Sequence, residues 1–382
     1  MNKGHESKNE PENGLRQETH HETGTVLYGI SKVEYGAGGC TPYPMCVKSC
    51  ANYLGQDVGI DFSMAASGAA FRLTWEAEAW NGGNVDVIHT FDDPEEVYKL
   101  GVEALGREFH IITRTNTACD VKLSINCSDK KHDFIRFIKK RIDAGFPCIA
   151  LGIIGPPEAC IIAGYGDNGE TLLGWNFFQD SFEFARDVKI DESGYFISGK
   201  WWENNDTIAI ISIGETIKPP ISRKEIIENA IRVMTGRLDK KSGKTFAKGI
   251  FAYDAWREGI LNEADFPRDA VLPLLAERLM CHGDAMDCLA DGRSNAAVYM
   301  KRLSEEAEEH GDSCRRIEQH FSRVAANIWS MAEILGGYER NEKQLKNFAR
   351  PEIRKQLAVL IEKCKQEDSK ALEELILLSK VL

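Results

Sequence analysis

Residues 158–166, EACIIAGYG, form the stretch of sequence that decides the fold. After Glu158, small and apolar side chains alternate along it, which is typical of a buried β-strand. The turn DNG follows at 167–169, where asparagine and glycine tolerate the left-handed backbone of a hairpin. A second apolar run, LLGWNF, occupies 172–177. The sequence therefore predicts two adjacent antiparallel strands near the middle of the chain.

Further strands and helices are expected around this pair. Three other apolar runs have the length of strands: residues 26–30, 147–154 and 208–213. Residues 131–144 instead carry apolar side chains at helical spacing, and proline near the start of 44–54 suits a first helical turn. This mixture, joined by short turns, predicts an α+β fold with a mostly antiparallel sheet.

A domain boundary is expected at Pro219 and Pro220, because consecutive prolines end a strand and resist starting a helix. Beyond them apolar side chains recur at helical spacing almost throughout, and the charged segment 239–245 is interpreted as a loop between helices. We expect three parts: a loose polar tail over 1–24, an α+β domain over 25–217 and an all-α helical domain over 221–382.

The composition is that of a globular protein, with 382 residues of which 43% are hydrophobic and 28% charged. A net charge of −12 argues against nucleic acid and anionic membranes as partners. No apolar run approaches the roughly 20 residues that span a bilayer, and residues 1–24 lack the apolar centre of a secretory signal. We therefore predict a cytoplasmic protein that binds neither nucleic acid nor membranes, and we leave open a homo-oligomer.

The eleven cysteines include no CxxC pair, so zinc-ribbon and thioredoxin-like folds find no support, and reduced thiols are expected. The segment 281–288 contains side chains that can bind metal, but a helix would not bring all of them to one face. The sequence predicts neither a metal nor another cofactor.

Cys40 is the candidate nucleophile. It follows two glycines and lies in the approach to the helix expected at 44–54, whose first turn would contain Cys46. A thiol at a helix start lies near unpaired backbone N–H groups and the positive end of the helix dipole, which lowers its pKa. The alternative is that Cys40 is a small side chain packed in a tight turn. The other cysteines in this half are expected mainly in the core: Cys46, Cys50, Cys148 and Cys160.

A glycine-rich lead to a cysteine before a helix, with a later apolar strand ending GYG at 164–166, resembles the papain-like cysteine peptidases. The chain is most similar to the N-terminal domain of the acyltransferase family of butirosin biosynthesis. Members of that branch often show a helix ending in YLG, here 53–55, and an SGAAF segment, here 67–71. The resemblance covers roughly residues 25–215. It implies a papain-like fold and cysteine-dependent acyl transfer or amide-bond chemistry on a small molecule or a carrier-bound acyl group.

Glu158 stands where this resemblance would place the general-base histidine, six residues before Gly164. Histidine suits that role because its ordinary pKa is near ~6.5, whereas a glutamate is ionised at neutral pH unless burial raises its pKa. The residue that orients the base would map to Asn176, with Asp180 as the alternative. The replacement argues against general proteolysis. Two classes stay open: an acyltransferase or amidohydrolase that uses Cys40, Glu158 and Asn176, or a catalytically inactive papain-like protein that binds a small ligand.

Four side chains are further candidates for contact with a ligand: Arg72, Trp75, Trp175 and His89. Arg72 could clamp an anionic group or form an ordinary salt bridge with Glu158. The two tryptophans could line a pocket or pack in the core, and His89 lies in a loop-like segment that could overhang a cleft. We expect the cleft between Cys40 and Glu158, with the helical domain as its roof.

Overall fold

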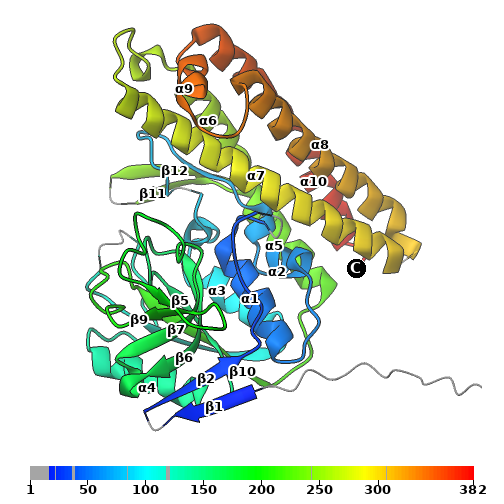
Figure 1. Ribbon diagram of the computed structural model, residues 1–382. Helices are drawn as coiled ribbons and strands as arrows, with labels where there is room; N and C mark the ends of the chain where they lie inside the picture. Colours follow the sequence, from blue (N-terminus) through cyan, green and yellow to red (C-terminus); the bar gives the residue numbers. More distant parts are fainter. Residues whose placement is uncertain are drawn as a thin grey trace, which may run out of the picture.

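The computed structural model describes residues 17–21, 23–36, 39–83, 85–117, 121–241, 243–306 and 308–382. It has an α+β region that contains a large antiparallel sheet and a region of long helices that stands on one side of it (Figure 1). Among the described residues no helix is both long and apolar enough to cross a membrane. The predicted α+β class is confirmed.

The main sheet contains nine strands within the described part of the chain, and all of their pairings are antiparallel. The strands are β1 (Gln17–His21), β2 (Gly24–Tyr28), β4 (Arg107–Thr113), β5 (Cys148–Leu151), β6 (Ala159–Gly166), β7 (Thr171–Trp175), β8 (Lys189–Ile190), β9 (Phe196–Ser198) and β10 (Ala209–Thr216). The predicted strand pair is β6 and β7, with Ile162 opposite Gly174. A Cβ at Gly174 would lie 1.8 Å from the Ile161 carbonyl oxygen, so glycine permits this close pairing.

Four α-helices accompany the sheet: α1 (Pro42–Tyr53), α2 (Ile60–Ala66), α3 (Glu96–Glu103) and α4 (Lys131–Ile142). Helix α1 begins two residues earlier than the sequence predicts, with Thr41 as its N-cap and Pro42 in the first turn. It contacts β5 and β6, and most of its side chains are buried. Cys40, two residues before α1, and Glu158, directly before β6, are both half-buried.

The helical region contains α5 (Arg223–Thr235), α6 (Ile250–Leu261), α7 (Leu272–Glu306), α8 (Gly311–Leu335), α9 (Glu342–Phe348) and α10 (Pro351–Ser379). The expectation of an all-α domain is wrong at one place, because β11 (Leu238–Lys241) and β12 (Lys244–Lys248) form a hairpin. Strand β12 also pairs with β3 (Thr74–Glu76), so that Ala247 lies opposite Trp75. The charged segment expected as a loop is thus a hairpin, and a distant strand of the α+β region supports it.

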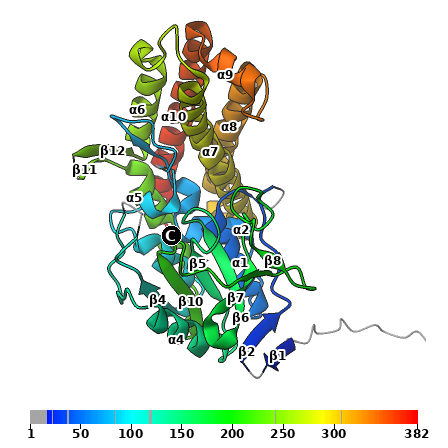
Figure 2. The ribbon, with the colours of Figure 1, turned by 60° about the vertical axis from the view of Figure 1, so that its left-hand side comes forward.

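The two regions share a hydrophobic core. Buried side chains of α7, α8 and α10 belong to the same core cluster as those of the sheet. At the junction the ring of Phe71 lies 6.0 Å from that of Phe321 in α8. Figure 1 shows α7 running across the top of the α+β region, and Figure 2 shows α8 and α10 beside α7 above that region. The helical region therefore packs against the α+β region through this shared core.

The expected tail over 1–24 is corrected in part. Residues 17–21 form β1, which pairs with β2 in antiparallel register from Gln17 opposite Tyr28 to His21 opposite Gly24. Strand β2 is held on its other side by β6. A polar segment can join such an edge because backbone pairing requires no apolar side chains. The rest of the expected tail, residues 1–16 and 22, lies outside the described residues.

Candidate functional site

A cavity of about 460 Å³ lies where the α+β region meets α7. Cys40, just before α1, and Glu158, just before β6, both line it. The roof comes from α7, which contributes Asp284, Asp287 and Cys288. The structure therefore brings together the two segments that the sequence analysis expected to form a cleft, under a wall from the helical region.

Cys40 is half-buried and its backbone N–H donates to Oδ2 of Asp291 in α7 at 3.1 Å. The Thr41 hydroxyl donates to the same oxygen at 2.6 Å, and Sγ of Cys40 lies 3.7 Å from the carbonyl oxygen of Asp287. Desolvation raises the pKa of the thiol, and the negative charges of Asp291 and Asp287 raise it further. The expected lowering by the helix start is wrong, because desolvation and the two nearby carboxylates outweigh any favourable effect of the helix start.

Glu158 is half-buried and lies directly before the first residue of β6, after two prolines. Loss of solvent raises the pKa of its carboxyl to about 8, and the nearby Asp86 adds to the rise. Below that pH the group is a neutral carboxylic acid with a proton to donate. Among the described residues no hydrogen bond joins Glu158 to Cys40: the thiol is bonded to the Asp287 carbonyl instead.

Arg72 is the cation of the α+β wall and is buried. Its Nε donates to the Val85 carbonyl at 2.8 Å and its Nη1 to the Ala69 carbonyl at 2.7 Å. Within the described part of the chain its Nη2 has no hydrogen-bond partner, which leaves donors for a ligand. Desolvation raises the pKa of Cys40, Glu158 and Asp86, and the positive charge of Arg72 opposes that rise at all three.

Arg72 forms no ion pair with Glu158 within 4.0 Å, so the ordinary salt bridge considered from the sequence is not formed.

The α7 wall has its own cation, Arg340, from the loop between α8 and α9. Its Nη1 lies 2.7 Å from Oδ1 of Asp284 and its Nη2 lies 2.6 Å from Oδ2 of Asp287. The Arg340 backbone is left-handed, with φ of 51°, and its guanidinium lies against Gly283, where a Cβ would be 2.6 Å from Nε. Desolvation raises the pKa of Asp287 to about 6 although Arg340 opposes the rise. Arg340 thus bridges the carboxyls of Asp284 and Asp287, an arrangement we call the Arg340 clamp. The pKa of both carboxyls is raised by desolvation.

The sequence analysis missed these α7 residues. A signal was present, because Asp284, Asp287, Cys288 and Asp291 recur at helical spacing and so share one face of α7. From the sequence, the segment 281–288 was interpreted only as a possible metal site. Among the described residues no group of three or more His, Cys, Asp or Glu side chains is arranged to hold a metal ion.

Asn176 does not line the cavity. It is buried, its Oδ1 accepts from the Phe178 backbone N–H at 2.7 Å, and its side chain bonds to the thiol of Cys160. Asp180, the alternative, is exposed and also lies outside the lining. The structure thus places Cys40 and Glu158 on one cavity and leaves the expected third residue in the turn after β7.

Three of the four expected ligand-contact residues also lie away from the cavity. Trp75 is buried in the helical core, where its ring stacks 6.1 Å from that of Trp256. Trp175 donates its indole N–H to the Ile30 carbonyl at 2.8 Å. The ring of His89 stacks on Phe246 of β12 at 5.4 Å. Of the four, Arg72 alone lines the cavity.

No protein-family model and no curated protein matches this chain.

Proposed function

We propose that the cavity is the site of cysteine-dependent acyl transfer or amide-bond chemistry on a small molecule or a carrier-bound acyl group, on a papain-like framework. One observation carries the proposal: Cys40, Arg72 and Glu158 lie more than thirty positions apart from one another in sequence, yet all three line the same cavity of about 460 Å³. That volume is typical of a site for a small ligand, for which about 300–1,000 Å³ is usual.

The proposed first step forms a thioester. Sγ of Cys40 attacks the carbonyl carbon of the acyl donor RCO–X, so that the S–C bond forms and the C–X bond breaks. Glu158 is protonated below about pH 8, so it can give its proton to X and then take up the proton that leaves the thiol. The products are the acyl-cysteine and H–X. An acceptor amine or water then attacks the thioester, and the thiol is restored.

Arg72 has a role in the same step. The carbonyl oxygen becomes negative as sulfur attacks, and a fixed cation in a desolvated site stabilises that charge. The guanidinium is held by two backbone carbonyls and keeps Nη2 for this oxygen. The positive charge of Arg72 also favours the thiolate of Cys40.

A second candidate function is a catalytically inactive protein that binds a small ligand. The raised pKa of Cys40 favours it, because a thiol that stays protonated at neutral pH is a poor nucleophile. The position of Asn176 outside the cavity favours it as well. Both candidates use the same cavity, and they differ in whether Cys40 forms a covalent bond.

The test is acylation by a small thioester probe at pH 7, read by peptide mass spectrometry. The background protein carries Cys127→Ser and Cys119→Ser, because Cys127 is exposed and Cys119 lies outside the described residues. If the protein is an enzyme, we expect the mass of the acyl group on the peptide that contains Cys40. This acylation should be absent in Cys40→Ser, and its rate should fall tenfold or more in Glu158→Gln. Labelling of Cys40 no faster than of a free peptide thiol would refute the enzyme. Cys46→Ser, which alters a buried thiol near by, is the matched control.

A further inference from the structure

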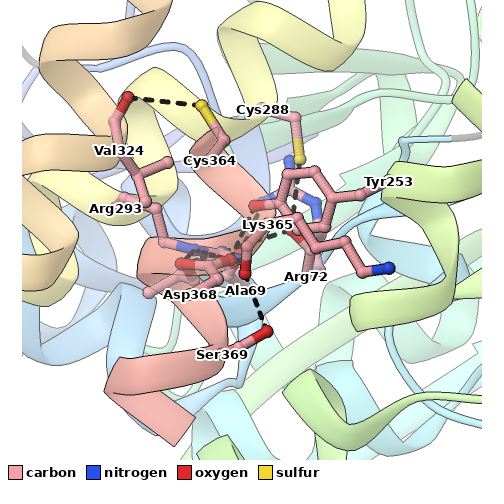
Figure 3. A network of polar contacts seen from close by, with 11 residues as sticks. Ala69, Arg72, Tyr253, Cys288, Arg293, Val324, Cys364, Lys365, Asp368 and Ser369 are labelled. Carbon is pink, nitrogen blue, oxygen red and sulfur yellow. Dashed lines mark hydrogen bonds and ion pairs between the residues drawn. The ribbon is translucent and has the colours of Figure 1, made fainter. Parts of the chain in front are cut away.

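A buried ion pair ties the helical region to the cavity wall. Arg293 of α7 and Asp368 of α10 are each 1% exposed, and Nη2 of Arg293 lies 2.6 Å from Oδ2 of Asp368. Nε of Arg293 donates to both carboxylate oxygens at 3.0 Å, and the Tyr253 hydroxyl donates to Oδ2 at 2.6 Å. Figure 3 shows Arg293 and Asp368 facing each other with Arg72 beside them. Because desolvation offsets most of the attraction in such a pair, stability alone is a weak reason for it.

The pair also reaches the backbone from which Arg72 projects. Nη1 of Arg293 donates to the carbonyl oxygen of Ala70 at 2.7 Å and to that of Arg72 at 3.3 Å. The thiol of Cys288, five residues before Arg293 in α7, lies 3.6 Å from the same Arg72 oxygen. Helix α7 can approach this closely because residue 292 is glycine: a Cβ there would be 2.7 Å from the Ala70 oxygen.

We propose that Arg293, oriented by Asp368, is a positioning residue that sets the place of the Arg72 guanidinium in the cavity. This inference rests on the proposed function, in which Arg72 stabilises charge at the reacting carbonyl. Arg293 fixes the carbonyls of residues 70 and 72, and the Arg72 side chain then turns back to bond the carbonyls of Ala69 and Val85. The planar guanidinium of Arg293 is needed for this positioning, because its several N–H groups bond the Asp368 carboxylate and the two backbone carbonyls at the same time.

The alternative is that the pair only holds α7 and α10 together. A double-mutant cycle separates the two roles. Arg293→Lys keeps the charge and loses the fork, and Arg72→Gln removes the cation from the cavity. If Arg293 acts through Arg72, Arg293→Lys slows labelling of Cys40 tenfold or more and moves its pH profile upward, because the thiol loses the favourable charge of Arg72. In the Arg72→Gln background it then has no further effect.

The matched control is Arg302→Lys. Arg302 also lies on α7 and forms an ion pair across the junction, at 3.0 Å from Asp61 in α2, but it does not line the cavity. A merely structural role predicts that both lysine variants lower the melting temperature and leave the pH profile of labelling unchanged. Equal slowing by Arg293→Lys with and without Arg72 would likewise overturn the inference.

A second measurement does not depend on the reactivity of Cys40. The Nε–H of Arg72 is buried and bonded to Val85, so it gives an NMR signal protected from exchange, assigned by its loss in Arg72→Gln. We expect this signal to shift and lose protection in Arg293→Lys, and to stay unchanged in Arg302→Lys. If Arg293→Lys does not fold, Asp368→Asn serves in its place. An unchanged signal in a folded variant refutes the positioning role, whereas an unreactive wild-type Cys40 refutes the proposed function alone.

Discussion

Removal of the Glu158 charge has a predicted effect on stability that depends on pH. The pKa of this carboxyl is about 8 in the folded chain against 4.5 for an unperturbed glutamate. A carboxyl with a raised folded pKa binds its proton more tightly in the folded state. Its contribution to stability is therefore complete below about pH 4.5, falls as the pH rises, and is lost above about pH 8.

The magnitude follows from the same values. Each pKa unit corresponds to about 1.4 kcal/mol, so ionising Glu158 costs the folded state about 3–5 kcal/mol. Glu158→Gln keeps the size of the side chain and removes the ionisation. We expect the variant to gain about 3–5 kcal/mol relative to the wild type between pH 5 and pH 9. The gain includes removal of the charge repulsion with Asp86, which contributes to the raised pKa of Glu158.

The assay is urea unfolding followed by circular dichroism at pH 5, 7 and 9. The quantity compared is the difference in unfolding free energy between Glu158→Gln and the wild type. Glu192→Gln is the control, because Glu192 is exposed and does not line the cavity. Curves for Glu158→Gln and the wild type that stay parallel from pH 5 to pH 9 would falsify the assignment of a neutral carboxylic acid to the cavity.

Two further predictions concern the junction and its clamp. Phe321→Ala should lower the unfolding free energy by about 3–5 kcal/mol, because the Phe321 ring is fully buried against Phe71. Denaturant should still unfold both regions in one transition. A loss of unfolding free energy below about 1 kcal/mol contradicts the shared core. Arg340→Gln should raise the pKa of Asp287 above its value of about 6, measured by carbon NMR of labelled aspartate, since the opposing cation is removed; an unchanged or lower pKa contradicts the clamp.

The sequence predicted secondary structure well where buried side chains form a local pattern of apolar residues. The uninterrupted apolar run of β6 and the hairpin residues after it are enough to predict the β6–β7 pair. Pro42 and Pro44 near the start of α1 indicate a helix that begins close to Cys40. These two elements place Cys40 and Glu158 at neighbouring ends of a helix and a strand that are in contact, and both side chains line the cavity.

The same local patterns could not reveal the electrostatic partners of the site. A helix start predicts a lowered thiol pKa, but in the folded chain desolvation raises the pKa of Cys40, and Asp291, about 250 positions further along the chain, adds to the rise. Asn176 follows β7 as the resemblance required, yet its side chain turns to Phe178 and Cys160. A short polar side chain can satisfy its hydrogen bonds in several directions, and the sequence does not record which one it takes.

By itself, then, the sequence determined the central strand pair, the helices near residues 44–54 and 131–144, and the identity of three cavity residues, because side-chain periodicity and turn residues act over a few positions. Only the tertiary structure decided that β12 adds to β3, that α7 roofs the cavity, and that Arg293 reaches the backbone of Arg72. Such contacts join residues far apart in the chain, and their energies depend on desolvation and distance, which exist only once the chain is folded.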